Sequence, residues 1–425
     1  MERIVQLTIE KMVFGGQGLA RLNGKAYFVW NALPGEVVEA RLIKSKKDYC
    51  EAQAIRILSP SPDRIEPLEA HYLSCSPWQV AVWDKENEWK QLMSIETYRK
   101  VGGLDLTPDI FYLDEFQTGY RNKMEYSFTD LPSGKMSLAF FNRGEHGRAA
   151  HEGCMLADPA INEVAEKILK WVNKYKIPYR SLKSLIVRSN NLGETIAGLF
   201  IKDRLDFKDY PELTKKFLGF QIYFSIYNSP ASVPTESLYQ SGQDFLTAQI
   251  LGTKLKFGLL SFFQVHIPVF EKALADMNEW VEKGDTAVDF YSGVGAISLP
   301  LRDKLAGAIL VDNNSEAIEY AKLNIKLNKA KNFSAECVPA EKITELIESD
   351  KVLILDPPRA GLHQDVTAKI LAEKPKKILY LSCNLSTQAR DLKALTAGGY
   401  KIKFSRLYNF FPRTPHVEGL VVLEI

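Results

Sequence analysis

The chain of 425 residues is long enough for two or three domains, and its 46% hydrophobic and 25% charged residues are typical of a globular protein. A formal net charge of +2 excludes an overall polybasic character, so any nucleic-acid surface must be local. The first seven residues lack the apolar core of a signal peptide, and no apolar run approaches the roughly 18 residues of a membrane span. The five cysteines form no CxxC pair, which favours a reducing cytoplasm over a disulfide framework or a closed zinc site. We therefore expect a cytoplasmic protein without membrane attachment.

Residues 1 to about 60 are predicted to form a small β-barrel domain. Short apolar runs alternate with glycine-containing turns, a pattern typical of four or five barrel strands. The phrases Phe14–Arg21 and Ala32–Glu36 resemble the TRAM domain, an OB-like barrel that binds RNA. Its basic strip would consist of Arg41, Lys44, Lys46 and Lys47. The alternative is that these cations only mark a solvated strand end.

Residues 61–255 are predicted to form a mixed α+β central domain that binds RNA, after a proline-containing linker at 60–64. A helical stretch at 83–101 is expected to pack on the C-terminal domain. Aromatic and basic residues are combined in Tyr120–Tyr126 and Phe140–Gly144, where they would stack bases and hold phosphates. The same combination is common on ordinary half-buried strands, so both interpretations remain open.

Residues 256–425 show a regular alternation of strand and helix, typical of a doubly wound, mostly parallel sheet. Strands are expected at 286–291, 308–312, 333–338, 351–356, 377–381, 401–408 and 416–425. Helices are expected between them, including one directly after Gly295 and one between residues 338 and 351. The last two strands are joined by a short loop, so they must pair antiparallel or be separated by one strand position.

A candidate nucleotide site lies at the carboxyl end of the first of these strands. Gly293 and Gly295 let the backbone turn sharply and approach a ligand. Asp312 ends the next strand, where an acidic side chain can accept both ribose hydroxyls. Leu299 stands near the place of the third glycine of a dinucleotide fingerprint, so the loop suits a single nucleoside. Together with the terminal β-hairpin, this pattern resembles the Rossmann-like fold of S-adenosylmethionine-dependent methyltransferases, with a binder of another nucleotide as the alternative.

The reactive centre is predicted where two later strands end, at Asp356-Pro-Pro-Arg359 and at Ser-Cys383-Asn. Among methyltransferases, Asp-Pro-Pro followed by Tyr or Phe marks enzymes that methylate exocyclic amines, and here Arg359 takes the place of the aromatic residue. An amine is already nucleophilic and needs no cysteine. Carbon-5 of uracil attacks a sulfonium methyl group only after a thiolate adds at carbon-6, and a base must then remove the carbon-5 proton. Cys383 therefore favours a pyrimidine carbon as the acceptor.

The longer motifs resemble the RNA (uracil-5-)-methyltransferase family. The resemblance lies in Asp356–Gly361, Ile378–Thr387, Phe262–His266 and Asn409–Glu418. It implies that Cys383 is the nucleophile and Glu418 the base that removes the carbon-5 proton. It also implies contacts to S-adenosylmethionine from Gln264, Tyr291, Asp312 and Asp356.

Each assignment has a structural alternative. Cys383 would otherwise be an inert core thiol, Glu418 a surface carboxylate and Asp356 a helix cap. We expect His416 to be structural, and Arg359 to anchor the loop or a phosphate rather than take part in bond-making. If the final strand lies antiparallel beside the Cys383 strand, Glu418 falls at the same edge. Thiolate attack also requires a depressed cysteine pKa, which we expect from nearby cationic groups.

Departures from the family pattern concern a metal site and the substrate contacts. Many relatives hold a four-iron cluster with four cysteines, whereas this chain offers Cys75 and Cys154. Two thiols cannot complete such a cluster, so we expect no cluster and no other metal. Asn409, Arg413 and His266 replace the family's Asp, Gln and Asn, which affects the substrate contacts and not the chemistry.

The sequence therefore predicts a monomeric enzyme that forms 5-methyluridine in RNA with S-adenosylmethionine as the methyl donor. The TRAM-like domain favours 23S rRNA, because many bacterial enzymes for the tRNA T-loop lack it. A tRNA T-loop enzyme is the first alternative. Two alternatives belong to other classes, a non-catalytic RNA-binding or RNA-folding protein and a methyltransferase of small molecules.

Overall fold

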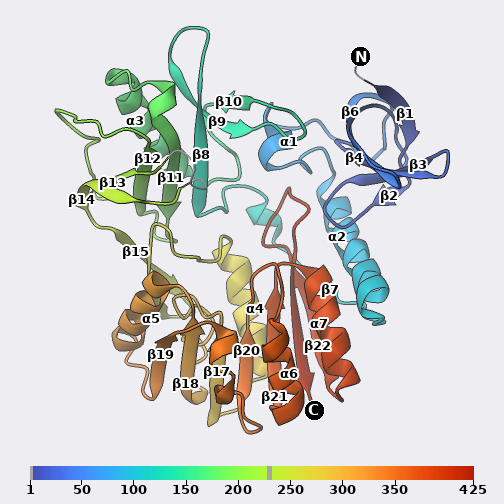
Figure 1. The fold of residues 1–425 in the computed structure, drawn as a ribbon, viewed down its shortest axis with the longest axis vertical. Helices are drawn as coiled ribbons and strands as arrows, with labels where there is room; N and C mark the ends of the chain where they lie inside the picture. The colour runs from blue at the N-terminus through green and yellow to red at the C-terminus, as the bar shows by residue number, and fades with distance from the viewer. Residues whose placement is uncertain (1–2, 227–231) are drawn as a thin grey trace.

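The C-terminal part of the chain contains an eight-stranded sheet. This sheet lies next to a seven-stranded central sheet and a six-stranded N-terminal barrel (Figure 1). The computed structural model describes residues 3–226 and 232–425. Met1 and Glu2 of the predicted barrel domain, and residues 227–231 of the predicted central domain, lie outside the described residues. Within the described ranges, no helix is both long and apolar enough to cross a membrane.

The N-terminal strands form a sheet in the order β1-β5-β6-β4-β3-β2, which curves into a barrel (Figure 1). Their bounds are β1 Ile4–Thr8, β2 Lys11–Met12, β3 Gly18–Leu22, β4 Lys25–Trp30, β5 Val37–Ser45 and β6 Tyr49–Ser59. Side chains of β5 and β6 alternate between buried and more exposed, so each strand gives one face to a core around Val38 and Ala52. Gly18 allows a close approach of two segments, since a Cβ there would lie 2.7 Å from Ile9 Cγ2. The predicted barrel is confirmed, with β2 and β3 as additional strands.

The central sheet has the order β10-β9-β8-β11-β12-β13-β14. Its strands are β8 Lys123–Asp130, β9 Met136–Phe141, β10 Arg148–His151, β11 Leu182–Ser189, β12 Thr195–Ile201, β13 Phe217–Phe224 and β14 Glu236–Gly242. Helix α3 (Pro159–Lys174) packs on one face and buries Ile161 and Ile168 against it. Its start follows from the sequence, because Pro159 occupies the first turn and Asp158 Oδ1 accepts a hydrogen bond from Ala160 N at 2.9 Å.

The C-terminal sheet has the order β19-β18-β17-β20-β21-β23-β22-β7. Its strands are β7 Asp109–Phe111, β17 Asp285–Phe290, β18 Leu305–Asp312, β19 Phe333–Cys337, β20 Val352–Leu355, β21 Lys377–Ser382, β22 Lys401–Tyr408 and β23 Glu418–Glu424. The strands from β19 to β21 are parallel, and β23 lies between β21 and β22, antiparallel to both. The predicted mostly parallel sheet with a C-terminal antiparallel strand is therefore confirmed.

Helices cover both faces of this sheet. The remaining helices are α1 Tyr72–Cys75, α2 Trp83–Thr97, α4 Ile267–Glu279, α5 Ser315–Leu327, α6 Gln364–Glu373 and α7 Leu385–Ala397. Helices α4 and α5 share a core with one face, and α6 and α7 share a core with the other. Helix α2 continues into a π-helical turn, Tyr98–Gly102, and packs on α7, where Tyr98 donates a hydrogen bond to Gln388 Oε1 at 2.7 Å.

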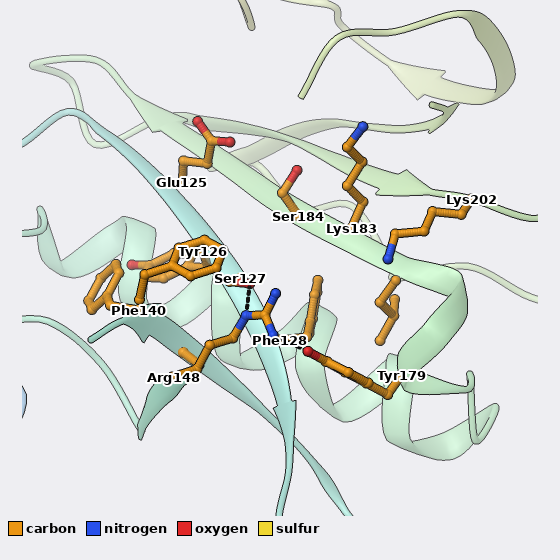
Figure 2. A pocket seen from close by; sticks show the side chains of 13 residues that line it. Glu125, Tyr126, Ser127, Phe128, Phe140, Arg148, Tyr179, Lys183, Ser184 and Lys202 are labelled. Carbon is orange, nitrogen blue, oxygen red and sulfur yellow. Dashed lines mark hydrogen bonds between the residues drawn. The ribbon is translucent and has the colours of Figure 1, made fainter. Parts of the chain in front are cut away.

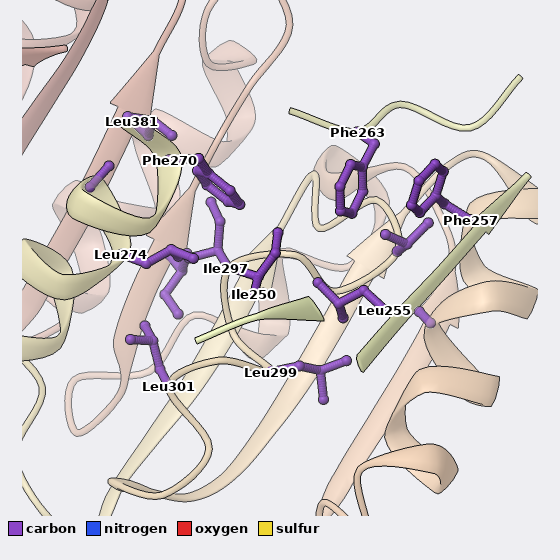
Figure 3. Close-up of a cluster of buried hydrophobic side chains, with 14 of the residues drawn as sticks. Ile250, Leu255, Phe257, Phe263, Phe270, Leu274, Ile297, Leu299, Leu301 and Leu381 are labelled. Atoms are coloured by element: carbon purple, nitrogen blue, oxygen red, sulfur yellow. The ribbon is translucent and has the colours of Figure 1, made fainter. Parts of the chain in front are cut away.

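The hairpin β15 (Phe245–Ile250) and β16 (Thr253–Gly258) joins the core on the α4 and α5 side (Figure 3). Ile250, Leu255 and Leu299 are fully buried there. Leu299 fills space that Gly295 leaves open, since a Cβ on Gly295 would lie 2.8 Å from Leu299 Cδ1. The leucine near the place of a third fingerprint glycine thus serves core packing.

Two predicted helices are wrong. Residues 293–304 form consecutive turns, because Pro300 has no N–H to donate and disfavours helical geometry at the residue before it. The segment between β19 and β20 contains two short 3₁₀ turns, Ala340–Lys342 and Thr344–Leu346. Both changes leave the strand order intact.

Candidate active site

Cys383 and Glu418 lie on neighbouring strands at one edge of the C-terminal sheet. The register of β21 and β23 pairs Ser382 with Gly419, which puts Cys383 opposite Glu418. Cys383 is half-buried and lies two residues before the start of α7, while Glu418 begins β23 and is 2% exposed. The antiparallel insertion of β23 thus brings together the two residues predicted to be nucleophile and base.

Three carboxyl groups in this region are poorly solvated. Burial and then the charge of Asp289 raise the pKa of Asp356 to about 7, whereas Gln264 Nε2 donates to Asp356 Oδ2 at 3.4 Å and opposes the shift. Burial also raises the pKa of Asp289 to about 7. The pKa of Glu418 lies well above its ordinary value because the carboxyl is buried and faces Asp356. Its Oε2 has no hydrogen-bond partner among the described residues, so it is available to a ligand.

The Cys383 thiol is protonated at neutral pH in the free protein. Burial and then the charges of Glu418 and Asp356 raise its pKa to about 12, while the Arg359 guanidinium opposes the shift. The prediction of a depressed cysteine pKa is therefore wrong for the free protein. The sequence shows that Arg359 is nearby, but it does not show that two buried carboxyl groups outweigh it.

A cavity of about 160 Å³ opens beside Cys383. Four separate parts of the chain line it, with Phe14 from the barrel, Lys90 from α2, Arg359 from the Asp356–Gly361 loop and His416 from the loop before β23. Phe14 is 49% exposed, so its ring is accessible for stacking on a base. The sequence analysis used Phe14 only as part of the TRAM resemblance, and it gave Lys90 no role.

A buried network holds the loop before β23 against α2. Lys90 Nζ donates to Glu86 Oε1 at 2.7 Å, to Asn409 Oδ1 at 2.8 Å and to the carbonyl oxygen of Phe411 at 3.1 Å. The backbone N–H of Arg413 donates to Glu86 Oε1 at 2.9 Å. Asn409 and Arg413, two of the departures from the family pattern, therefore hold the loop in place through these contacts.

The residues before α4 connect the central sheet to the same edge. Asn122 Nδ2 donates to the carbonyl oxygen of Gln264 at 2.8 Å. His266 is fully buried and stacks on Tyr120 with 5.0 Å between ring centroids. Burial lowers the pKa of His266 to about 4, so the ring is neutral. His266, the third departure from the family pattern, is therefore accommodated as a neutral ring packed against Tyr120.

The residues predicted to bind the cofactor gather where β17, β18 and β20 end. Gly293 N donates to Asp312 Oδ2 at 2.9 Å, which ties the loop to β18. Gly293 and Gly295 have φ values of +55° and +84°, and a Cβ at Gly293 would meet open space. Tyr291 has φ +64°, a strained value for a residue with a side chain. Tyr291 also lines an open cleft of about 850 Å³.

A groove on the central sheet forms a second candidate surface (Figure 2), with a volume of about 490 Å³. Arg148 lies over the rings of Phe141 and Tyr179, 4.6 Å and 5.4 Å from their centroids. Lys183 and Lys202 lie across the groove from Arg148 in Figure 2. Phe141 is 64% exposed, although large apolar side chains are usually covered. This combination of aromatic and cationic groups suits stacked bases and phosphates.

The predicted basic strip of the barrel is partly neutralised. Lys44 pairs with Glu51 at 3.2 Å, and Arg41 pairs with Glu145 from the turn between β9 and β10. Lys46 and Lys47 are exposed. The strip alone is therefore a weaker candidate for an RNA contact than the groove.

Comparisons with known proteins agree with this geometry. A family model described as tRNA (uracil-5-)-methyltransferase matches residues 255–425, and a TRAM domain model matches residues 3–55. A curated relative from Aquifex aeolicus, called an uncharacterized RNA methyltransferase, is 30% identical over 447 residues, with 100% of this chain and 99% of the relative covered. A relative of the same description from Clostridium tetani is 30% identical over 449 residues, with 99% and 97% covered.

A solved structure has the same fold along its whole length. It is the Pyrococcus abyssi tRNA (uracil-54, C5)-methyltransferase in complex with S-adenosyl-L-homocysteine, with a TM-score of 0.78 and 22% identity. The match covers 99% of this chain and 100% of that one. Taken with the relatives of 30% identity, these likenesses show that the chain belongs to the RNA (uracil-5-)-methyltransferase family and carries an N-terminal TRAM domain.

Proposed function

We propose that this protein methylates carbon-5 of a uridine in structured RNA, with S-adenosylmethionine as the methyl donor. The observation that carries the proposal is the position of Cys383 opposite Glu418, beside a cavity lined from the barrel, α2 and the C-terminal sheet. A nucleobase in this cavity would meet the Cys383 sulfur, and Glu418 lies opposite Cys383 on the adjacent strand. Both groups are needed to activate carbon-5 of uracil and to release the product.

The steps balance with these two side chains. Cys383 gives its proton to solvent, and its sulfur adds to carbon-6, which leaves an enolate that is nucleophilic at carbon-5. S-adenosylmethionine, when bound, supplies an electrophilic methyl group and a positive charge. Once carbon-5 carries the methyl group, Glu418 removes the carbon-5 proton, and the electron pair re-forms the ring double bond and expels the Cys383 sulfur. A carboxylate with a raised pKa, as at Glu418, is a strong base for this last step.

The donors around β17 and β18 fit a nucleoside cofactor. Asp312 ends β18 at the loop that contains Gly293, where its carboxylate would accept the ribose hydroxyls while Gly293 keeps the backbone accessible. Ser292 Oγ and Asp289 Oδ1 are buried without hydrogen-bond partners among the described residues, which supports a polar ligand at this place. Tyr291, Gly295, Gln264 and Asp356 would complete the site. Asp356 also has the charge to balance a sulfonium.

The target uridine must leave its stack to reach Cys383. The exposed Phe14 ring is placed to stack on the displaced base or its neighbour. The groove between Arg148 and Lys202 would then hold a more distant part of the same RNA. A structured RNA is favoured, because the barrel and the central sheet offer contacts on different parts of the molecule.

We infer 23S rRNA as the substrate from the N-terminal TRAM domain. A tRNA T-loop is the second candidate, favoured by the full-length likeness to an enzyme described as acting on uracil-54 of tRNA. The test is deletion of the gene followed by mapping of 5-methyluridine in rRNA and tRNA. Loss of one rRNA methyl group would support the first substrate and loss of the T-loop methyl group the second, while unchanged maps in both RNAs would contradict the proposed function.

A non-catalytic RNA-binding protein is the main rival from another class. It would bind RNA without binding S-adenosylmethionine, which equilibrium dialysis with the labelled cofactor measures directly. Cofactor binding that is lost in Asp312→Ala, with the fold retained, would exclude this rival.

A further inference from the structure

Four potential metal ligands meet beside the short helix α1, away from Cys383. This ligand cluster consists of Glu69, His71, Cys75 and Cys154. One ligand atom from each side chain lies within 4.8 Å of all the others. Figure 1 shows that α1 lies next to β9 and β10, the strands that precede the segment with Cys154. The fold thus brings together ligands that are far apart in the sequence.

We propose that the ligand cluster binds a single zinc ion. Zinc accepts sulfur, nitrogen and oxygen donors in a tetrahedral arrangement with bonds of about 2.0–2.3 Å, so its ligand atoms lie about 3.3–3.8 Å apart. His71 Nε2 and Glu69 Oε2 are already 3.5 Å apart. Small side-chain rotations would bring the remaining ligand atoms to this spacing. The proposal replaces the sequence-based expectation of no metal.

An unpartnered nitrogen points to a missing ligand. His71 is 8% exposed, and its buried Nε2 makes no aligned hydrogen bond to the described residues, although it lies 3.5 Å from Glu69 Oε2. Leaving such an atom unpaired is unfavourable, and a bond to a metal would offset this cost. A four-iron cluster held by four cysteines does not fit, because the described residues supply two thiols at this place, Cys75 and Cys154.

The charges around the ligand cluster balance with zinc. Two thiolates and the Glu69 carboxylate carry three negative charges, and a zinc ion carries two positive ones. Arg121 supplies the remaining positive charge, because its guanidinium interacts electrostatically with both Cys75 and Cys154. The buried Nε of Arg121 has no hydrogen-bond partner among the described residues, so this nitrogen does not bind an anion elsewhere.

A second layer of hydrogen bonds orients the ligands. Gln79 Nε2 donates to Glu69 Oε2 at 3.0 Å and to Ser76 Oγ at 2.6 Å, and Ser76 Oγ lies 3.0 Å from Cys75 Sγ. Metal sites depend on such outer contacts, which fix the direction of each donor. The ion would therefore connect α1, and with it the start of α2, to the segment after β10.

The test is metal analysis of the full-length protein, purified under reducing conditions and dialysed against zinc. We expect about one zinc ion per chain and no iron, a zinc-dependent rise in Tm, and intense visible absorption when cobalt(II) replaces zinc. Cys154→Ser should lose the zinc. The control Cys337→Ser, the same change at an exposed cysteine, should keep it.

Ser76→Ala keeps the test decisive if Cys154→Ser fails to fold. This substitution leaves all four ligands in place and should weaken zinc binding about 10–100-fold, the usual effect of losing an outer contact. Substoichiometric zinc in the wild-type protein would overturn the proposal. So would full zinc content in folded Cys154→Ser, iron with inorganic sulfide, or a disulfide between Cys75 and Cys154 in the protein as isolated.

Discussion

The region around Cys383 and the ligand cluster at Cys75 use the same chemical groups for opposite purposes. Both combine thiol and carboxyl side chains in a partly buried place. At Cys383 the sulfur faces a cavity of about 160 Å³, and Glu418 approaches from the neighbouring strand. At Cys75 the donor atoms lie within 4.8 Å of one another. The first arrangement leaves room for a substrate, and the second leaves room for one ion.

The electrostatic surroundings differ as well. Burial and the carboxylates of Glu418 and Asp356 raise the pKa of Cys383, so the free protein keeps this sulfur protonated until the local charge changes. Arg121 lies near Cys75 and Cys154 and would stabilise thiolates that a metal can hold permanently. If both proposals hold, geometry and charge, rather than residue type, decide whether a cysteine in this protein serves covalent catalysis or metal binding.

The largest expected effect is that of removing the Cys383 sulfur. Cys383→Ala should abolish both turnover and any covalent RNA adduct, because no other described thiol lines the cavity. Methyl transfer from labelled S-adenosylmethionine and denaturing gels of the enzyme–RNA mixture measure the two effects. Cys337→Ser is the matched control, since it removes an exposed sulfur, and it should keep wild-type activity. Turnover by Cys383→Ala would show that this sulfur is not the nucleophile. The proposed contrast between Cys383 and the ligand cluster would then be wrong.

Glu418→Gln should separate the two halves of the reaction. Addition and methylation proceed without this carboxylate, but removal of the carbon-5 proton slows, so turnover should fall about 10²–10⁴-fold. A methylated covalent adduct should accumulate on the same denaturing gels. If the variant is slow and forms no adduct, Glu418 acts before or during addition, and its assignment as the final base is wrong.

Local motifs and strand patterns made these residues predictable from the sequence. The family motifs pointed to Cys383 and Glu418, but their common edge followed from the sequence only if the last strand inserted beside the Cys383 strand, an arrangement that the structure supplies. The contact between Lys90 and Asn409 was not predictable, because it joins residues 319 positions apart that carry no local pattern. The raised pKa of Cys383 depends on burial, which charge counting does not show. The sequence analysis paired Cys75 with Cys154 but missed Glu69 and His71, because an isolated Glu and His carry no local metal-binding pattern.

The central groove should affect RNA binding and not chemistry. Phe141→Ala removes the exposed ring beneath Arg148, and losing one stacked base costs about 1–3 kcal/mol, so KM for RNA should rise about 10–100-fold at unchanged kcat. Leu192→Ala is the control, because it shortens another exposed apolar side chain that does not line the groove. A fall in kcat at unchanged KM would show that the groove affects the chemistry at Cys383, which would contradict its assignment to RNA binding.

The smallest expected effect on turnover concerns the buried carboxyl groups where the strands of the C-terminal sheet end, and it is a change in stability. Asp289 has its pKa raised by burial to about 7, whereas an unfolded aspartate titrates near 3.9. The folded protein therefore binds this proton more tightly, and stability is lost as the pH rises from about 4 to about 7. Asp289→Asn removes this loss, so the variant should match the wild type near pH 4 and exceed it by up to about 4 kcal/mol at pH 8, since each of the roughly three pKa units corresponds to about 1.4 kcal/mol. Urea unfolding at several pH values measures the difference, with Asp303→Asn as the exposed control that should show none. A variant that is less stable than the wild type at pH 8 would mean that ionised Asp289 has a compensating partner. In that case the charge of Asp289 would be balanced by a neighbouring group, as we propose for the charges of the ligand cluster.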